Sequence, residues 1–295
     1  MPRQSQQPKQ LIGPKGTLID ICLPIFGEFG LAVEAIKRVN DAALPLTANT
    51  YRLIVVDNGT PPWISNVDDK EISPKEMAKP IKELLRPNHD RFMRLEQNIG
   101  YPGGVNKAVK AGRSPLILIL TADVFLEPGA IHKMVTVMDN PDVGVVGAKL
   151  LFPLNMESPH GPGGMVQHAG LAFDIRGNSY HVFLGWSPDN PRVNVRHDMA
   201  AVTGACFMTR RNLWQQIGGF DPQYGLGTYE DMDYCFSIRA MGKKIIFDPS
   251  IVGYHLVSGA KLQGANAQGF NIPVNKTIFR GKWARALAWD EWRYL

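Results

Sequence analysis

Residues 116–127 read LILILTADVFLE, five aliphatic residues followed by a polar turn that carries Asp123. A short aliphatic run of this kind is typical of a strand that is buried on both faces of a parallel sheet. It is the most apolar segment of the chain, so we predict that it lies centrally in the sheet. The polar residues after it would then lie at the carboxyl edge, where open α/β sheets bind ligands.

On the N-terminal side of this run, strand-like and helix-like patterns alternate. Strands are predicted at residues 17–25, 51–56 and 91–95, and helices at 29–39, 79–85, 103–111 and 128–138. Such alternation predicts a parallel sheet with helices on both faces, the α/β class. The C-terminal side has a different pattern. Its predicted strands are 143–146, 166–174, 201–209 and 244–247, the last ending in a turn at Pro249, and its predicted helices are 210–217 and 230–241.

The composition fits a folded domain with an anionic ligand. The chain has 295 residues, 44% hydrophobic and 20% charged, which suits one large α/β domain or two small ones. Residues 1–15 are polar and are expected to form a disordered tail. The net charge of +5 suits a nucleoside diphosphate, an anionic membrane surface or nucleic acid. No P-loop and no G-x-G-x-x-G sequence is present, which argues against P-loop NTPases and dinucleotide enzymes.

Several features favour a cytoplasmic location. Residues 1–10 lack the apolar core of a secretory signal, and the run 116–120 is too short to span a bilayer, so no transmembrane segment is expected. The three cysteines, Cys22, Cys206 and Cys235, lie in apolar segments and are expected to be buried free thiols. The C-terminal extension 261–295 is rich in tryptophan. Its aromatic side chains either pack on the domain or make a peripheral membrane contact.

Polar residues follow three of the predicted strands. Asp57 follows the second strand, Asn98 and Gly100 follow the third, and Asp123 follows LILIL. Their convergence at one sheet edge predicts a site of nucleotide size. A carboxylate such as Asp123 can bind Mg²⁺ or Mn²⁺ and so neutralise a diphosphate. The alternative is that Asp123 caps a helix or a turn.

The segment YEDMDYC contains three acidic residues at the start of a predicted helix. Acidic residues there often only stabilise the helix dipole. Asp231, however, shares a helical face with Cys235 and Ile238, so it should point inward, where a raised pKa would suit a general base. Asp233 is expected to be structural. His255 follows a strand-like run and is either a buried, hydrogen-bonded histidine or a metal ligand.

Taken together, these motifs resemble glycosyltransferase family 2, especially its rhamnosyltransferase-like branch. The resemblance covers residues 17–255 and is carried by segments in the family's order: IDICLPIFGE (19–28), LIVVDNGT (53–60), NIGYPGGVNKAV (98–109), LILILTADVFLEPGAI (116–131), VQHAGLAFD (166–174), VTGACFMTRRNLWQQIGGFDPQYG (202–225) and YEDMDYCFSIRAMGKKIIFDPSIVGYH (229–255). One departure is Thr121, which stands where many relatives have a first metal-binding acid.

The resemblance implies a GT-A fold over 16–260, with a Rossmann-like nucleotide-binding half (16–125) and an acceptor-binding half (126–260). It implies an inverting single displacement, with Asp231 as base and Asp123 and His255 as ligands of Mn²⁺ or Mg²⁺. The donor site would be formed by Pro24, Phe26, Glu28, Asp57, Asn98, Gly100, Gly104, Asn106, Ala122 and Asp123. The acceptor side would be formed by Trp186, Gly204, Tyr229 and Glu230.

The donor would be a UDP-, dTDP- or GDP-linked sugar, and the acceptor a hydroxyl of a glycan, a lipid-linked saccharide or another molecule. Two other functions stay open from the sequence. A nucleotidyltransferase has a similar core, but it usually carries basic residues in the first loop, which here reads PIFGEFG. A catalytically inactive nucleotide-sugar binding module would keep the fold. The glycines of residues 223–229 also predict a mobile loop beside the acidic cluster.

Overall fold

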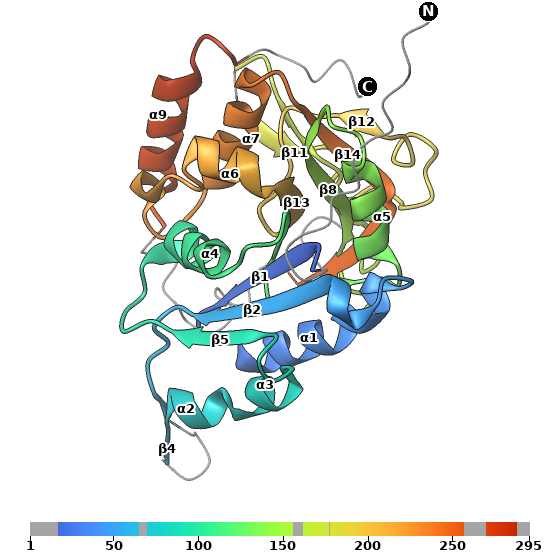
Figure 1. The fold of residues 1–295 in the computed structure, drawn as a ribbon. Helices are drawn as coiled ribbons and strands as arrows, with labels where there is room; N and C mark the ends of the chain where they lie inside the picture. The colour runs from blue at the N-terminus through green and yellow to red at the C-terminus, as the bar shows by residue number, and fades with distance from the viewer. Residues whose placement is uncertain (1–16, 65–69, 156–161, 177, 257–269, 288–295) are drawn as a thin grey trace, which may run out of the picture.

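The computed structural model describes residues 17–64, 70–155, 162–176, 178–256 and 270–287, and these form one large sheet with helices on both faces (Figure 1). The sheet order is β12–β14–β8–β13–β6–β1–β2–β5. These strands are β1 (Ile19–Ile25), β2 (Tyr51–Asp57), β5 (Arg91–Arg94), β6 (Leu116–Leu120), β8 (Val143–Leu151), β12 (His197–Asp198), β13 (Cys206–Arg210) and β14 (Lys244–His255). The predicted α/β class is confirmed, and LILIL forms the central strand β6.

The sheet is mostly parallel. Strands β5, β2, β1 and β6 pair in parallel, β13 pairs antiparallel with β6 and β8, and β8 pairs in parallel with β14. Shorter strands complete the architecture: β7 (Val124–Leu126) pairs with β14 and β9 (Val166–His168) with β8, while β3 (Trp63–Ile64) pairs with β4 (Glu71–Ile72) and β10 (Leu171–Phe173) with β11 (Ser179–His181). Because β6 and β14 point the same way, both end at the same edge.

The helices divide between the two faces of the sheet. One face is covered by α1 (Phe29–Ala43), α3 (Lys79–Leu84) and α5 (Ala130–Met138), with α2 (Pro74–Met77) beside α3. The other is covered by α4 (Gly100–Ala111), α6 (Arg211–Ile217) and α7 (Glu230–Ala240), with α9 (Ile272–Trp283) packed outside them; two 3₁₀ turns are η2 (Ala48–Thr50) and η3 (Pro222–Tyr224). No helix among the described residues is long and apolar enough to cross a membrane.

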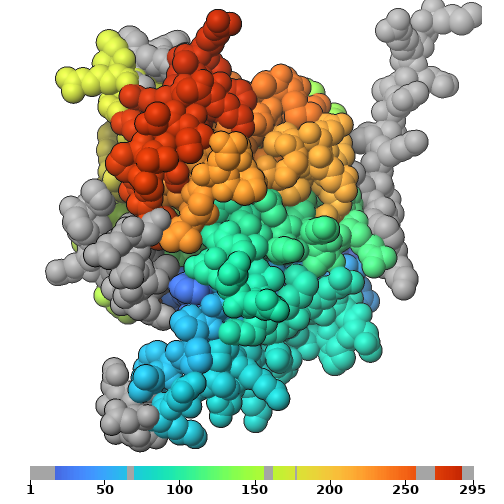
Figure 2. Space-filling model, turned by 90° about the vertical axis from the view of Figure 1, so that its left-hand side faces the viewer, coloured from blue at the N-terminus to red at the C-terminus, as the bar shows by residue number. Residues whose placement is uncertain are grey.

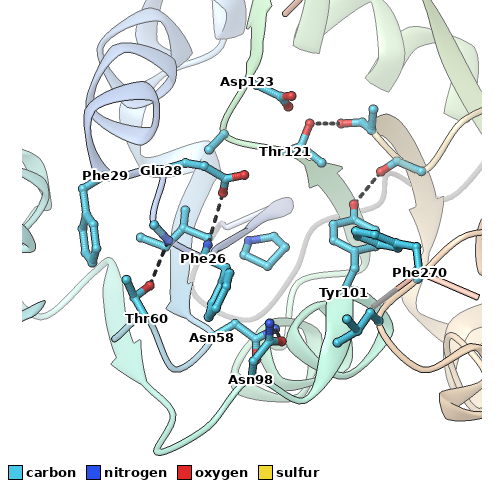
Figure 3. A pocket seen from close by; sticks show the side chains of 18 of the residues that line it. Phe26, Glu28, Phe29, Asn58, Thr60, Asn98, Tyr101, Thr121, Asp123 and Phe270 are labelled. Carbon is cyan, nitrogen blue, oxygen red and sulfur yellow. Dashed lines mark hydrogen bonds between the residues drawn. The ribbon is translucent and has the colours of Figure 1, made fainter. Parts of the chain in front are cut away.

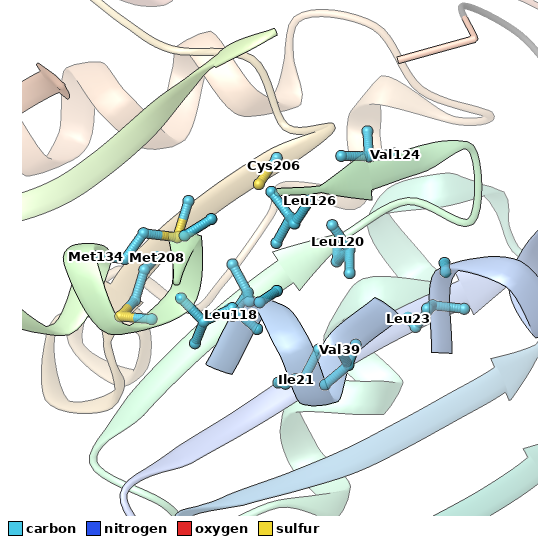
Figure 4. Close-up of a cluster of buried hydrophobic side chains, with 14 of the residues drawn as sticks. Ile21, Leu23, Val39, Leu118, Leu120, Val124, Leu126, Met134, Cys206 and Met208 are labelled. Atoms are coloured by element: carbon cyan, nitrogen blue, oxygen red, sulfur yellow. The ribbon is translucent and has the colours of Figure 1, made fainter. Parts of the chain in front are cut away.

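The alternation of side chains along the central strands produces a core on each face. Leu118 and Leu120 of β6 pack with Met134 of α5 on one face (Figure 4), whereas Ile117 and Ile119 belong to the core under α4, α6 and α7. All three cysteines are buried free thiols, as predicted. Each core contains residues from both predicted halves of the chain, because β13 and β14 complete the sheet that β1, β2 and β6 begin.

Three of the differences between the predicted elements and the structure affect the site. The predicted strand 166–174 is two strands, β9 and β10, which are separated at Gly170, where φ is +99°. The predicted strand 201–209 begins only at Cys206, because residues 203–205 turn away to line a cavity. The predicted turn at Pro249 is a bulge, and β14 continues beyond it to His255. That continuation is important for the site, since it brings His255 to the carboxyl edge.

Candidate active site

A cavity of about 1380 Å³ opens at the carboxyl ends of β1 and β6. Its walls come from the loop after β1, the loop after β6, residues 203–205, residues 226–228 and the first turn of α7. Figure 3 shows Glu28, Asp123 and Tyr101 around this cavity. The volume exceeds what a small metabolite needs and suits a ligand of nucleotide-sugar size.

Asp123 and His255 meet at one wall of the cavity. The antiparallel pairing of β7 with β14 places His255 opposite Val124, the residue after Asp123. The Nε2 atom of His255 lies 3.4 Å from Oδ2 of Asp123. The Nδ1 atom of His255 lies 3.1 Å from Oε1 of Gln167. An amide oxygen only accepts hydrogen bonds, so Nδ1 carries a proton and donates it to Gln167. The contact with Gln167 through Nδ1 leaves Nε2 directed at the carboxylate of Asp123, so a bound cation could be ligated by Nε2 and by an oxygen of Asp123 together.

The residues present fit a divalent metal. A spacing of 3.4 Å between the two ligand atoms is close to the roughly 3 Å between neighbouring ligands of an octahedral ion with bonds near 2.1 Å. Among the described residues, no group of three or more His, Cys, Asp and Glu side chains could hold a metal. A metal at Asp123 and His255 would therefore need further ligands from the phosphates of a nucleotide and from water, as Mg²⁺ and Mn²⁺ commonly take.

Asp231 and Glu230 form the acidic part of the wall at the start of α7. Oδ2 of Asp231 accepts from the N–H of Gly204 at 2.8 Å, and Oδ1 accepts from the N–H of Met232 at 2.8 Å. Burial raises the pKa of Asp231 in spite of these hydrogen bonds. Burial, reinforced by the charge of Asp231, raises the pKa of Glu230 to about 8. The backbone hydrogen bonds from Gly204 and Met232 favour the carboxylate form of Asp231, so a proton shared by the pair is better placed on Glu230.

The loop 203–205 is fixed from behind by a pair of histidines. His168 is fully buried, and its Nε2 accepts from the N–H of Thr203 at 3.2 Å. Burial holds the pKa of His168 well below its usual range, so the ring is neutral. Its proton must then be on Nδ1, which donates to Nδ1 of His181 at 2.9 Å. In front, Tyr101 donates its hydroxyl to the carbonyl of Gly204 at 2.7 Å.

The charges that face the cavity are unusual for the binding of an anion. Four carboxyl groups line it, those of Glu28, Asp123, Glu230 and Asp231. Burial raises the pKa of Glu28 to about 7, and the charge of Asp123 adds to this effect. No Lys or Arg occurs among the described residues that line the cavity. A diphosphate bound here would need a cation to offset the negative charge of Asp123.

The structure brings most of the predicted site residues to the cavity. Those that line it are Pro24, Phe26, Glu28, Asn98, Ala122, Asp123, Gly204, Glu230, Asp231 and His255. Those that do not line it are Asp57, Gly100, Gly104, Asn106, Trp186 and Tyr229.

The predicted residues outside the cavity have structural contacts. Asp57 is fully buried, forms an ion pair with Arg94 and accepts from the N–H of Thr60, so it fixes the loop after β2. Asn106 bonds both the N–H and the carbonyl of Phe220.

The other four also pack against neighbouring residues. Gly100 packs against Gly225, and Gly104 against Asn58 and Pro24. Trp186 is 38% exposed and contacts Phe183 and Arg192, and the ring of Tyr229 packs against Phe279.

Several lining residues were not predicted. Asn58, Thr60, Tyr101 and Thr228 contribute polar groups, and Phe270 contributes an aromatic ring. Tyr101 lies inside the NIGYPGG segment and Asn58 directly follows Asp57, so their positions were a usable signal. Phe270 has no such signal, because it precedes α9 and reaches the cavity only through tertiary packing.

Comparison with known families identifies the domain. A model described as "Glycosyltransferase like family 2" matches residues 87–269, more than half of the chain. The chain belongs to this family. The glycosyltransferase family 2 chain is 26% identical over 221 residues to the uncharacterized protein y4gI of Sinorhizobium fredii, covering 72% of this chain and 22% of that protein.

A second relative is the O-antigen biosynthesis protein RfbC of Myxococcus xanthus. It is 30% identical over 154 residues, covering 50% of this chain and 11% of that protein. The family 2 chain thus spans about a fifth and about a tenth of these two relatives.

Solved structures agree on the fold. GalNAc-T7 with UDP, GalNAc and Mn²⁺ matches with a TM-score of 0.60 and 14% identity, covering 84% of this chain and 44% of that one. The mannosyltransferase PcManGT from Pyrobaculum calidifontis, in complex with GDP-Man and Mn²⁺, matches with a TM-score of 0.55 and 16% identity. The match covers 86% of this chain and 61% of that one. The family 2 chain therefore has the GT-A fold predicted from its motifs.

Proposed function

We propose that the domain transfers a sugar from a nucleotide-sugar donor to a hydroxyl acceptor by an inverting single displacement. The observation that carries the proposal is one cavity that joins the Asp123–His255 pair to the buried carboxylate of Asp231, with no Lys or Arg among its described lining residues. Solved GT-A proteins with UDP or with GDP-Man contain Mn²⁺, which supports a metal and a nucleoside diphosphate donor here.

Asp123 and His255 would hold the metal, which when bound would stabilise the negative charge on the departing nucleoside diphosphate. Asp231 is held as a carboxylate by two backbone N–H groups and can accept one proton. That proton would leave the acceptor hydroxyl as its oxygen bonds to the anomeric carbon and the bond to the diphosphate oxygen breaks. Attack from the side opposite the leaving group inverts the configuration at that carbon.

The relative in O-antigen biosynthesis supports a saccharide acceptor, either a growing glycan or a lipid-linked one. We place the domain in the cytoplasm, where nucleotide sugars would reach it. A peripheral membrane contact through the C-terminal extension stays a prediction. Trp283 packs against Phe236 of α7, and Trp289 and Trp292 lie outside the described residues.

The experiment is a screen of UDP-, dTDP- and GDP-sugars for release of nucleoside diphosphate, with Mn²⁺, with Mg²⁺ and with EDTA. We expect release only with metal, and Asp123→Asn should abolish metal-dependent binding of the nucleoside diphosphate. Asp142→Asn, at an exposed position on the loop before β8, is the matched control and should behave as wild type.

Release of pyrophosphate would instead indicate nucleotidyl transfer. Tight donor binding without turnover of any donor would indicate a binding module. Full activity in EDTA would contradict the metal site.

A further inference from the structure

Helix α9 lies beyond residue 269, where the match to the family model ends, yet it packs against the wall that carries Asp231. In Figure 2 the red α9 lies directly on the orange part of the chain that contains α6 and α7. Phe279 contacts Phe236 of α7, and Lys282 and Trp283 both bond Asp233, at 2.8 Å and 2.6 Å. Asp233 is thus structural, as predicted, and it fastens α7 to α9.

The chain is strained where it enters α7. Thr228 and Tyr229 have φ of +79° and +72°, so two successive residues other than glycine adopt the left-handed region. This conformation is unfavourable for side chains with a Cβ, and most of all for a β-branched one such as Thr228. Such strain persists only where the surrounding structure enforces it, and it is frequent at active sites. The next two residues are Glu230 and Asp231, so the turn sets where α7 begins and where both carboxyl groups point.

Asn275 of α9 supplies the enforcing contacts. Its side-chain Nδ2 lies 3.0 Å from the carbonyl oxygen of Tyr224, 2.7 Å from that of Gly227 and 3.1 Å from that of Thr228. It also lies 3.0 Å from the hydroxyl of Thr228. The two N–H groups of this amide donate to two of the four acceptors at a time, and because Asn275 is only 4% exposed, water does not replace it.

The other side of the turn is fixed by α4. The N–H of Tyr101 donates to the carbonyl of Leu226 at 3.1 Å, and Gly100 packs against Gly225. Leu226, Gly227 and Thr228 all line the cavity. The segment predicted from its glycines to be a mobile loop is therefore held by contacts on two sides in this structure.

We propose that Asn275 is a positioning residue, which holds the strained Thr228–Tyr229 turn so that the carboxyl of Asp231 faces the transferred sugar. The inference rests on the proposed function in one respect, the role of Asp231. It adds that α9, which the family match does not include, is required for full activity of the site although it contributes no proton acceptor.

The test compares Asn275→Leu, which keeps the size and removes the donor, with Lys276→Met as matched control. Lys276 fastens the same helix to Asn178 and does not touch the turn. For Asn275→Leu we expect the amides of residues 225–231 to lose protection from hydrogen exchange by roughly tenfold or more, while the strands keep theirs. The transfer rate should fall on the order of 10–100-fold, as a misplacement of about 1 Å can cause. Donor affinity should stay within about twofold, because Asp123 and His255 are untouched.

A rescue separates positioning from general destabilisation. Glycine adopts positive φ without strain, so Thr228→Gly in the Asn275→Leu background should restore part of the lost transfer rate. Unchanged amide hydrogen exchange at residues 225–231 in Asn275→Leu would overturn the inference. Faster hydrogen exchange there together with an unchanged transfer rate would also overturn it. If Lys276→Met lowered the transfer rate as much as Asn275→Leu does, that result would overturn the inference too. If wild-type protein turns over no donor, the proposed function fails on its own, and the exchange measurement still decides whether Asn275 holds the turn.

Discussion

At the scale of single residues, the acidic pair is the feature on which the chemistry depends. Glu230 and Asp231 are neighbours in sequence, and both side-chain oxygens of Asp231 accept backbone hydrogen bonds, from Gly204 and from Met232. Oε2 of Glu230 is buried without a hydrogen-bond partner, so ionising Glu230 is costly. The difference in environment separates the two pKa values and leaves Asp231 as the group able to accept a proton.

Asp231→Asn should therefore keep the fold and donor binding and lose transfer. The amide cannot take a proton, and general-base catalysis typically contributes ~10²–10⁴-fold, so the rate should fall by that order. One of the two backbone hydrogen bonds is lost, which should cost about 1 kcal/mol of stability. Transfer rate and donor binding are measured on the same preparation. Transfer near the wild-type rate would place the base elsewhere.

Glu230 should affect stability through pH. Its pKa in the folded protein, about 8, lies above the usual 4.5, so its contribution to stability is complete below about pH 4.5 and is lost as pH rises through about 8. Glu230→Gln has no proton to lose. The free energy of unfolding is measured with urea for the variant and for wild type at pH 6 and at pH 9. We expect the difference, variant minus wild type, to be larger at pH 9 by about 1 kcal/mol or more. An equal difference at both pH values would show that Glu230 does not titrate in this range.

At the scale of elements, the antiparallel pairing of β7 with β14 brings together Asp123 and His255, the two proposed metal ligands. Asp123 ends the turn after β6, and His255 is the last residue of β14. The backbone also joins them, because the N–H of Leu256 donates to the carbonyl of Asp123 at 3.0 Å. Any change that separates β7 from β14 should therefore weaken metal binding before it unfolds the sheet.

Gly253→Val tests this pairing. A Cβ at Gly253 would lie 3.1 Å from Cδ2 of Leu126 and 3.3 Å from the carbonyl oxygen of Phe125, so a larger side chain should push β7 away. We expect about 1–3 kcal/mol of destabilisation from overpacking. The Mn²⁺-dependent affinity for UDP, dTDP or GDP should fall roughly tenfold or more, as when support for a metal ligand is lost. Gly281→Ala on α9 is the control, because a Cβ added there would meet no described atom within 4 Å beyond the neighbouring backbone of its own helix. Unchanged metal dependence would show that the pairing tolerates the added atoms.

At the scale of the whole molecule, the two halves predicted from the sequence share one sheet. The central strand β6 has β1 on one side and β13 on the other, so a strand from the predicted second half (126–260) pairs with a strand from the predicted first half (16–125). The core under α1 and α5 likewise combines Ile21 with Met208 and Ile251. A site between the halves is therefore held by a continuous core.

Residues 17–125 expressed alone should consequently fail to fold cooperatively. Without β13 and the helices of the second half, β6 would expose the aliphatic side chains that it buries in both cores. The measurement is urea unfolding followed by circular dichroism and tryptophan fluorescence. The full chain should give coincident sigmoidal transitions, and the fragment none. A sigmoidal transition for the fragment would show that the first half is an independent domain.

The sequence by itself determined the local features of this protein. Aliphatic runs marked β1, β2 and β6, and helical spacing predicted that Asp231 points inward, because these patterns depend on near neighbours in the chain. The order of the motifs was sufficient to identify the family and its fold. The placement of Asp123 directly after the central strand followed from the same local pattern.

Only the tertiary structure decided which of these residues share a cavity. His255 reaches Asp123 through a strand pairing that its local sequence does not encode, and before the structure only the family resemblance had placed the two residues together. Asp57 and Asn106 were equally plausible from sequence, yet Arg94 and Phe220 satisfy them outside the cavity. The hold of Asn275 on the turn before Asp231 is likewise a long-range contact. Hydrogen-bond partners far along the chain are chosen by packing, and a local pattern cannot specify them.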